Sequence, residues 1–133
     1  MTALTTDRNT KSRDGKTLFL PVAAGVTIYQ GALVALENGY AVPAKTASGL
    51  KGLGRAKARA DNSAGAAGEV GVEIEKGVFL FENDITNTCS PADIGAPAYA
   101  VDDQTVANTD GAGTRSAVGV IFDVDSAGVW VKF

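Results

Sequence analysis

Residues 32–43 read ALVALENGYAVP, and this stretch decides the fold class. Two short apolar runs, 32–37 and 40–43, flank the dipeptide Asn38-Gly39. An Asn-Gly pair between apolar runs is the strongest short signal for a type I′ turn, because both turn residues must adopt positive φ. The stretch therefore predicts a β-hairpin.

The same pattern recurs along most of the chain, where short runs of Val, Ile, Ala and Phe alternate with Gly, Asn and Asp turns. Apart from a short helical turn at residues 90–93, where Ser90 before a proline is a plausible cap, no segment has a sustained helical period. The sequence therefore predicts an all-β fold with short helical turns. Besides the hairpin, we expect strands at residues 17–22, 26–29, 50–60, 69–76, 78–82, 98–101, 117–124 and 129–133, the last two joined as a hairpin by residues 125–128.

The length of 133 residues and the composition, with 45% hydrophobic and 20% charged residues, predict one globular domain. Residues 1–16 are polar and are expected to form a flexible or extended arm in front of a β-rich body, residues 17–133. The arm has four basic and two acidic residues, so its charge is +2. Because the net charge of the whole chain is −3, the body carries a charge of −5. The basic residues of the arm are Arg8, Lys11, Arg13 and Lys16.

Two alternating segments predict charge pairing between neighbouring strands. Residues 55–60 read RAKARA, which places the three basic residues on one face of a strand. Glu69, Glu73 and Glu75 share a face of the segment that follows, so antiparallel pairing would set bases against acids. This pairing is favoured over phosphate or nucleic-acid contact by the basic run. The opposite faces are then predicted to place Val70, Val72 and Ile74 in the core with Ala56, Ala58 and Ala60.

Few side chains are suited to catalysis. The chain has no histidine, so Cys89 and the serines lack the usual base of a nucleophilic site. No phosphate-binding glycine motif is complete, and the acidic pairs Asp102-Asp103 and Asp123/Asp125 match no calcium loop. We therefore expect no enzymatic activity, no cofactor and no metal. Cys89 is expected to be a buried or half-buried thiol with no disulfide partner.

Charge and hydropathy restrict the expected partners of the protein and its cellular compartment. A net charge of −3 disfavours general nucleic-acid binding, which needs a dominant basic surface. The first 16 residues lack the apolar run of a secretory signal, and no stretch approaches the length of a membrane helix. The sequence thus predicts a soluble protein made in a reducing cytoplasm.

One short segment suggests a different function. Residues 72–78, VEIEKGV, resemble the lysine-bearing hairpin of lipoyl domains, in which a modified lysine lies between two strands near acidic residues. The resemblance implies a carrier domain with Lys76 as the modified residue. A surface lysine at a β-turn explains the same residues and is the favoured interpretation.

Most of the body resembles the capsid decoration proteins, or head cement proteins, of tailed bacteriophages. The resemblance lies in the order and spacing of weak motifs rather than in any single one. These motifs are AGVTIYQGALVAL (24–36), YAVPA (40–44), GLGRA (52–56), DNSAG (61–65), GVF (77–79), IGAPAY (94–99), AVGVI (117–121) and VWVKF (129–133).

This resemblance implies a small β barrel of the kind called a β-tulip, which is usually a homotrimer on the shell. It implies a structural virion protein, made in the host cytoplasm, that binds the outside of the capsid and stabilises it. The expected partner is the major capsid protein, reached by the N-terminal arm, with no membrane or direct nucleic-acid contact. The expected capsid-contact residues are Arg8, Lys11, Arg13 and Lys16. Another virion β module, from a tail tube or baseplate, remains an alternative.

Overall fold

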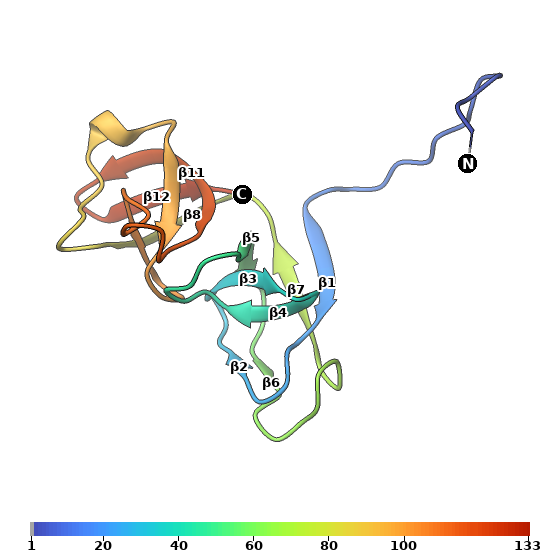
Figure 1. Cartoon of the computed structure of the whole chain (residues 1–133), viewed down its shortest axis with the longest axis horizontal. Coiled ribbons are helices and arrows are strands. Elements are labelled where there is room, and N and C mark those ends of the chain that lie inside the picture. The colour runs from blue at the N-terminus through green and yellow to red at the C-terminus, as the bar shows by residue number, and fades with distance from the viewer. Residues whose placement is uncertain (1) are drawn as a thin grey trace.

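The computed structural model describes residues 2–133, and the N-terminal half is a curled antiparallel sheet (Figure 1). Its strand order is β1-β7-β5-β3-β4. The sheet curls back toward its first strand, because Val22 forms a parallel bridge with Ala41 and the Ala23 N–H donates to the Ala41 carbonyl at 3.0 Å. The strands are β1 (Thr17–Pro21), β3 (Leu33–Glu37), β4 (Tyr40–Pro43), β5 (Lys51–Ala56) and β7 (Gly71–Glu75), with the short pair β2 (Thr27–Ile28) and β6 (Ala60–Asp61) packed against the same core.

The C-terminal half closes into a small five-stranded barrel with the order β10-β8-β12-β11-β9. Only the β10–β8 pair is parallel, and β9 pairs with β10 to complete the ring. The sequence-based prediction of a compact all-β fold with a small barrel is therefore confirmed. The strands are β8 (Val78–Asn83), β9 (Pro97–Ala100), β10 (Thr105–Ala107), β11 (Ala117–Asp125) and β12 (Gly128–Lys132).

The predicted hairpin at residues 32–43 is confirmed. β3 and β4 are antiparallel neighbours, with Glu37 opposite Tyr40. Asn38 and Gly39 have φ of 51° and 83°, the left-handed conformation that a type I′ turn requires at both positions. The second predicted hairpin is also present, with Asp125 of β11 opposite Gly128 of β12.

Strand β3 belongs to two cores because both of its faces are buried. Leu33 and Ala35 pack with the residues that fill the barrel. Val34, between them, points to the other side and packs in the core of the curled sheet. Side chains alternate across a strand, so a continuous apolar run is what a strand buried on both faces requires. The barrel core includes Phe81, Ala98, Ala100, Val106, Val118, Ile121, Val129 and Val131.

The backbones of the two halves touch where β5 passes β11. A Cβ atom on Gly52 would overlap the Val118 carbonyl, so the two backbones are in direct contact at this point. A buried hydroxyl ties the same region together, since Ser116 Oγ donates to the Ala47 carbonyl at 2.6 Å and accepts from the Leu50 N–H at 2.9 Å. Gly52 is therefore needed for close approach and not for an unusual backbone angle.

Some predicted elements differ from the observed ones. The strand expected over residues 50–60 is broken into β5 and β6, and β10 was not predicted at all. Ala58 falls in the break and is exposed, which corrects its predicted core position. Val70 is half-buried beside the core, whereas Val72, Ile74, Ala56 and Ala60 are buried as predicted.

The predicted short helical turn is present as a 3-10 turn at Pro91–Asp93 with Ser90 at its N-cap. The expected cap was the Ser90 side chain, but here the Asp93 carboxylate accepts a hydrogen bond from the Ser90 N–H at 2.8 Å. Within residues 2–133, no helix has the length and apolar character needed to cross a membrane.

The predicted charge pairing between strands is confirmed for two of the three basic residues. β5 and β7 are antiparallel with Arg55 opposite Glu75, and Arg55 Nη2 lies 3.1 Å from Glu75 Oε1. Lys57 Nζ lies 3.6 Å from Glu73 Oε1. Arg59 instead lies over the ring of Tyr29, 5.2 Å from its centroid. The break after β5 turns the chain there, so the alternation expected of one long strand does not reach Arg59.

We predict that Gly52→Ala lowers the free energy of unfolding by about 1–3 kcal/mol, because the added methyl group must displace backbone and not a flexible side chain. Urea unfolding followed by fluorescence measures the change. Gly15→Ala is the matched control, since a Cβ there meets nothing within 4 Å. Equal stability of the two variants would show that the contact at Gly52 can relax.

Candidate binding surfaces

The N-terminal arm, residues 2–16, extends away from the body (Figure 1), and every one of its residues is exposed. The main-chain hydrogen bond that anchors its base runs from the Lys76 N–H to the Lys16 carbonyl at 2.7 Å, next to the start of β1. Among the described residues, no ion pair involves any of its four basic side chains. The whole length of the arm is therefore open to contact with other molecules. Its basic side chains, unpaired among the described residues, are Arg8, Lys11, Arg13 and Lys16.

A second exposed surface covers the outside of the barrel. We call it the outer wall, and it consists of Val78, Leu80, Val120, Phe122 and Trp130. Strand pairing sets Leu80 beside Trp130, while Val78 and Val120 both flank Lys132. Leu80, Val120 and Phe122 are 41%, 45% and 56% exposed. The exposed Lys132 lies between Val78 and Val120, so the outer wall combines apolar side chains with a charge, as protein–protein contact surfaces commonly do.

Two local features shape the outer wall. The register of β11 against β12 shifts between Ile121 and Asp123, so Phe122 lies in a bulge and points outward while Ile121 stays in the core. The indole Nε1 of Trp130 donates to Asp125 Oδ2 at 3.0 Å. This hydrogen bond is the main reason that the pKa of Asp125 lies below its ordinary value. It also fixes the orientation of the ring at the surface.

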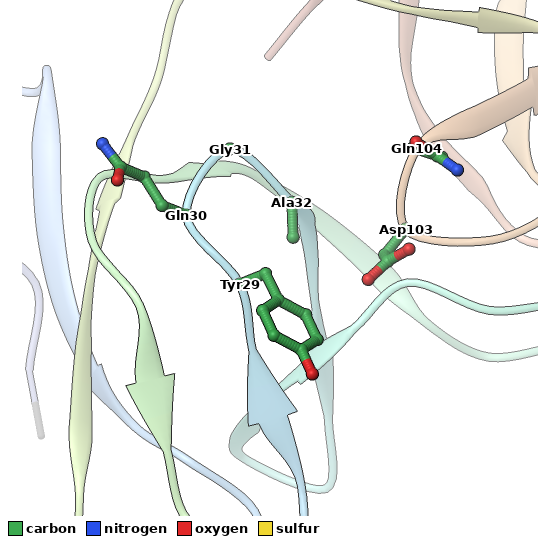
Figure 2. A pocket seen from close by; sticks show the side chains of 6 residues that line it. All are labelled: Tyr29, Gln30, Gly31, Ala32, Asp103 and Gln104. Atoms are coloured by element: carbon green, nitrogen blue, oxygen red, sulfur yellow. The ribbon is translucent and has the colours of Figure 1, made fainter.

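A pocket of about 270 Å³ opens where the turn after β2 faces the loop between β9 and β10 (Figure 2). Asp103 faces the ring of Tyr29 across it. A main-chain hydrogen bond holds the two sides together, from the Leu33 N–H to the Asp103 carbonyl at 2.8 Å. We call this cavity the Tyr29–Asp103 pocket. Its lining residues are Tyr29, Gln30, Gly31, Ala32, Asp103 and Gln104.

The Asp103 carboxylate has no ion-pair partner among the described residues. Partial burial raises its pKa, and the neighbouring Asp102 charge raises it further. Both effects disfavour the ionised carboxylate. When Asp103 is ionised, no basic side chain among the described residues forms an ion pair with it.

A wider hollow of about 440 Å³ lies next to this pocket and shares Gly31 with it. Leu80 and Trp130 of the outer wall line its other end, so the hollow joins the pocket to the wall. Arg55 is the basic residue that lines this hollow. Its guanidinium lies 4.3 Å from the Phe79 ring centroid and forms an ion pair with Glu75.

Of the four acidic residues considered as metal ligands, Asp102 and Asp125 stabilise turns. Asp102 Oδ1 accepts from the Gln104 N–H at 2.9 Å, and Asp125 Oδ1 accepts from the Ala127 N–H at 2.8 Å. Asp123 Oδ1 bonds to the next N–H along the chain. Within residues 2–133, no three His, Cys, Asp or Glu side chains come together as a metal site.

The lysine of the lipoyl-like segment does not lie at the tip of a hairpin. β7 belongs to the curled sheet and β8 to the barrel, so Lys76 lies where the chain crosses between the two units. Its Nζ donates to the Leu53 carbonyl at 3.1 Å and the residue is half-buried. A carrier lysine must be reachable by its modifying enzyme, so this placement disfavours the carrier interpretation.

Cys89 is buried, with 2% of its surface exposed. Its backbone is held at both ends by one side chain, since Asn83 accepts from the Cys89 N–H at 2.8 Å and donates to the Cys89 carbonyl at 2.9 Å. Burial, followed by the charges of Asp93 and Asp84, raises the pKa of the thiol to about 11. The thiol is therefore neutral and shielded at neutral pH.

No protein-family model, no curated protein and no solved structure matches this chain. The arm, the outer wall and the pocket are therefore judged on their own chemistry. Sequence reasoning identified the arm but missed the pocket and the wall. The alternation of Val with Trp130 near the C-terminus was the one signal for an outward-facing aromatic residue.

We predict that iodoacetamide alkylates Cys89 much more slowly in the folded protein than in the unfolded chain at pH 8. Because the folded pKa is raised, the folded rate should keep rising above about pH 10, whereas the unfolded rate levels off from about pH 9.5, one unit above the ordinary thiol pKa of about 8.5. Mass spectrometry over a pH series measures both rates. Similar rates in the folded and unfolded states would mean that the thiol is accessible.

Proposed function

We propose that this chain is a capsid decoration protein, a structural virion protein that binds the outside of a tailed-bacteriophage shell and stabilises it against the pressure of packaged DNA. The proposed partner is the major capsid protein, and the proposed site of action is the capsid surface after synthesis in the host cytoplasm. This role requires a rigid body and a means of attachment. It requires no catalytic site, cofactor or metal.

The arm is the observation that carries the proposal. Residues 2–16 are exposed throughout and lead directly into β1, so whatever the arm binds is coupled to the β body. A polar arm without a core face of its own gains order only when a partner supplies the contacts, for example by adding a strand to an exposed sheet edge. A shell of repeated subunits offers such a partner many times over.

The repeated geometry of a shell turns modest contacts into firm attachment. Each bound copy stabilises the assembled shell by mass action, because it binds the assembled state and not the separated subunits. If copies are also linked to one another, each link makes the next attachment effectively intramolecular. A protein used in this way needs moderate affinity per copy, which an exposed basic arm can supply.

We predict that deleting residues 1–16 leaves the melting temperature of the body nearly unchanged and sharply weakens binding to shells of the cognate major capsid protein. Co-sedimentation of the protein with purified shells measures the binding. A matched variant in which Arg8, Lys11, Arg13 and Lys16 are all changed to Gln separates the charge of the arm from its length.

The charge variant should lose part of the binding, and the loss should shrink as salt rises, because the Debye length is only about 8 Å at physiological ionic strength. A control variant with Asp7→Asn and Asp14→Asn should bind as well as the unchanged chain or better. Binding of the truncated chain as tight as that of the full chain would contradict the proposed role of the arm.

We further propose that the body forms a closed homotrimer through the outer wall. The wall gathers Leu80, Phe122 and Trp130 on one sheet face, and a ring of three buries this face when it packs against a different surface of the next copy. A ring built from this contact would present all arms with the same symmetry, as attachment around a shell axis requires.

We predict that Leu80→Lys shifts the protein toward monomer and raises the dissociation constant by about tenfold or more, because an unpaired charge would be buried in the contact. Sedimentation equilibrium over a concentration series measures the shift. Ile85→Lys is the control, since Ile85 is 95% exposed and lies outside the wall. An unchanged chain that stays monomeric at high concentration would contradict a trimer formed before shell binding.

A further inference from the structure

We propose that the Tyr29–Asp103 pocket binds a guanidinium or alkylammonium group, as carried by an arginine or lysine side chain. This inference goes beyond the proposed function, since it concerns the isolated chain and needs no shell. It rests on three properties of the pocket, which are its unpaired carboxylate, its aromatic side and its small, fixed floor.

The carboxylate is the first property. Asp103 is partly buried, lacks an ion-pair partner among the described residues, and has Asp102 as its chain neighbour. Partial burial weakens the hydration of the carboxylate, and a like charge next to it adds repulsion. A cation in the pocket would relieve both effects, and its hydrogen bonds to the carboxylate would be charge-assisted.

The aromatic side is the second property. Tyr29 is 56% exposed, and Figure 2 shows its ring and the Asp103 carboxylate on facing sides of the pocket. The face of an aromatic ring attracts cations, most often arginine. The chain already uses this attraction, because Arg59 lies 5.2 Å from the Tyr29 ring centroid. Arg59 is not among the residues that line the pocket, so the pocket offers a second approach to the same ring.

The floor is the third property. Gly31 and Ala32 leave about 270 Å³ open, which suits a small cationic group on an alkyl stem. The turn that forms the floor is fixed by main-chain hydrogen bonds, from the Gly31 N–H to the Ala56 carbonyl at 2.9 Å and from the Ala32 N–H to the Tyr29 carbonyl at 3.1 Å. Little order has to be gained on binding, which favours affinity in a small site.

The source of the cation is either the arm of a second copy or an arginine or lysine of another protein. The arm qualifies because its basic side chains are exposed and it extends away from its own body, where it can reach a neighbour (Figure 1). A shell protein that presents a basic loop would offer the same chemistry. The pocket is the same in both cases, and an experiment distinguishes the two sources of the cation.

The direct test is an NMR titration of the full chain with butylguanidinium, using butylurea as the uncharged probe of the same shape. The amide signals of Gly31, Ala32 and Gln104 are expected to shift together with butylguanidinium and to stay in place with butylurea. Equal shifts with both probes, or shifts confined to other parts of the chain, would overturn the proposal.

Variants assign the binding to named groups. Asp103→Asn should weaken butylguanidinium binding by about tenfold, as expected for the loss of a hydrogen bond to a charged group. Tyr29→Leu should weaken it by about two- to fivefold, which is the worth of an exposed cation–π contact. Asp110→Asn removes the same charge from an exposed loop position outside the pocket and should bind like the unchanged chain. Binding by Asp103→Asn as tight as that of the unchanged chain would rule out this site.

A concentration series then identifies the source. If the arm of a second copy is the ligand, the same amide signals move as the full chain is concentrated, and deleting residues 1–16 abolishes the movement while binding of butylguanidinium persists. If another protein supplies the cation, concentration has no effect and the signals move only when that protein is added. Because the probe titration contains no shells, failure of shell binding and failure of the pocket are separate results.

Discussion

Burial of β3 on both faces is the constraint on which the rest of the structure depends. Leu33 and Ala35 supply the barrel core, and Val34 supplies the core of the curled sheet. Neither core is complete without this strand, so the two units fold around a shared element and cannot hinge freely about it. The contact of Gly52 with the Val118 backbone then fixes how closely the units approach. Packing at this density makes the position of one unit dictate that of the other.

The pocket is a consequence of the same arrangement. The hydrogen bond from Leu33 to Asp103 joins the start of β3 to a loop of the barrel. This bond brings Asp103 opposite Tyr29, although the two residues are far apart in the chain. Some charges of the body are paired locally, as those of Arg55 and Glu75 are on neighbouring strands. Asp103 is left unpaired at the junction, which is where a binding group can be kept without disturbing either core.

Different parts of the molecule thus determine its shape and offer contacts to partners. The two packed cores give the body a fixed form, while the contacts available to partners lie on the arm, the outer wall and the junction pocket. The arm contributes positive charge and the pocket contributes a carboxylate, so the two are opposite in charge. The outer wall differs from both, because it exposes apolar side chains around Lys132 and its Trp130 ring is held by Asp125.

The sequence by itself determined the all-β class, the Asn38-Gly39 hairpin, the pairing of Arg55 and Lys57 with glutamates, and the arm. These features depend on turn conformation and on alternation between neighbouring residues, which are local and leave a pattern in the chain. Only the tertiary structure decided the break that exposes Ala58, the strand β10, the outer wall and the meeting of Tyr29 with Asp103. Each of these depends on where distant segments pack, and Gly52 shows why, because the sequence does not reveal which glycine must admit another backbone.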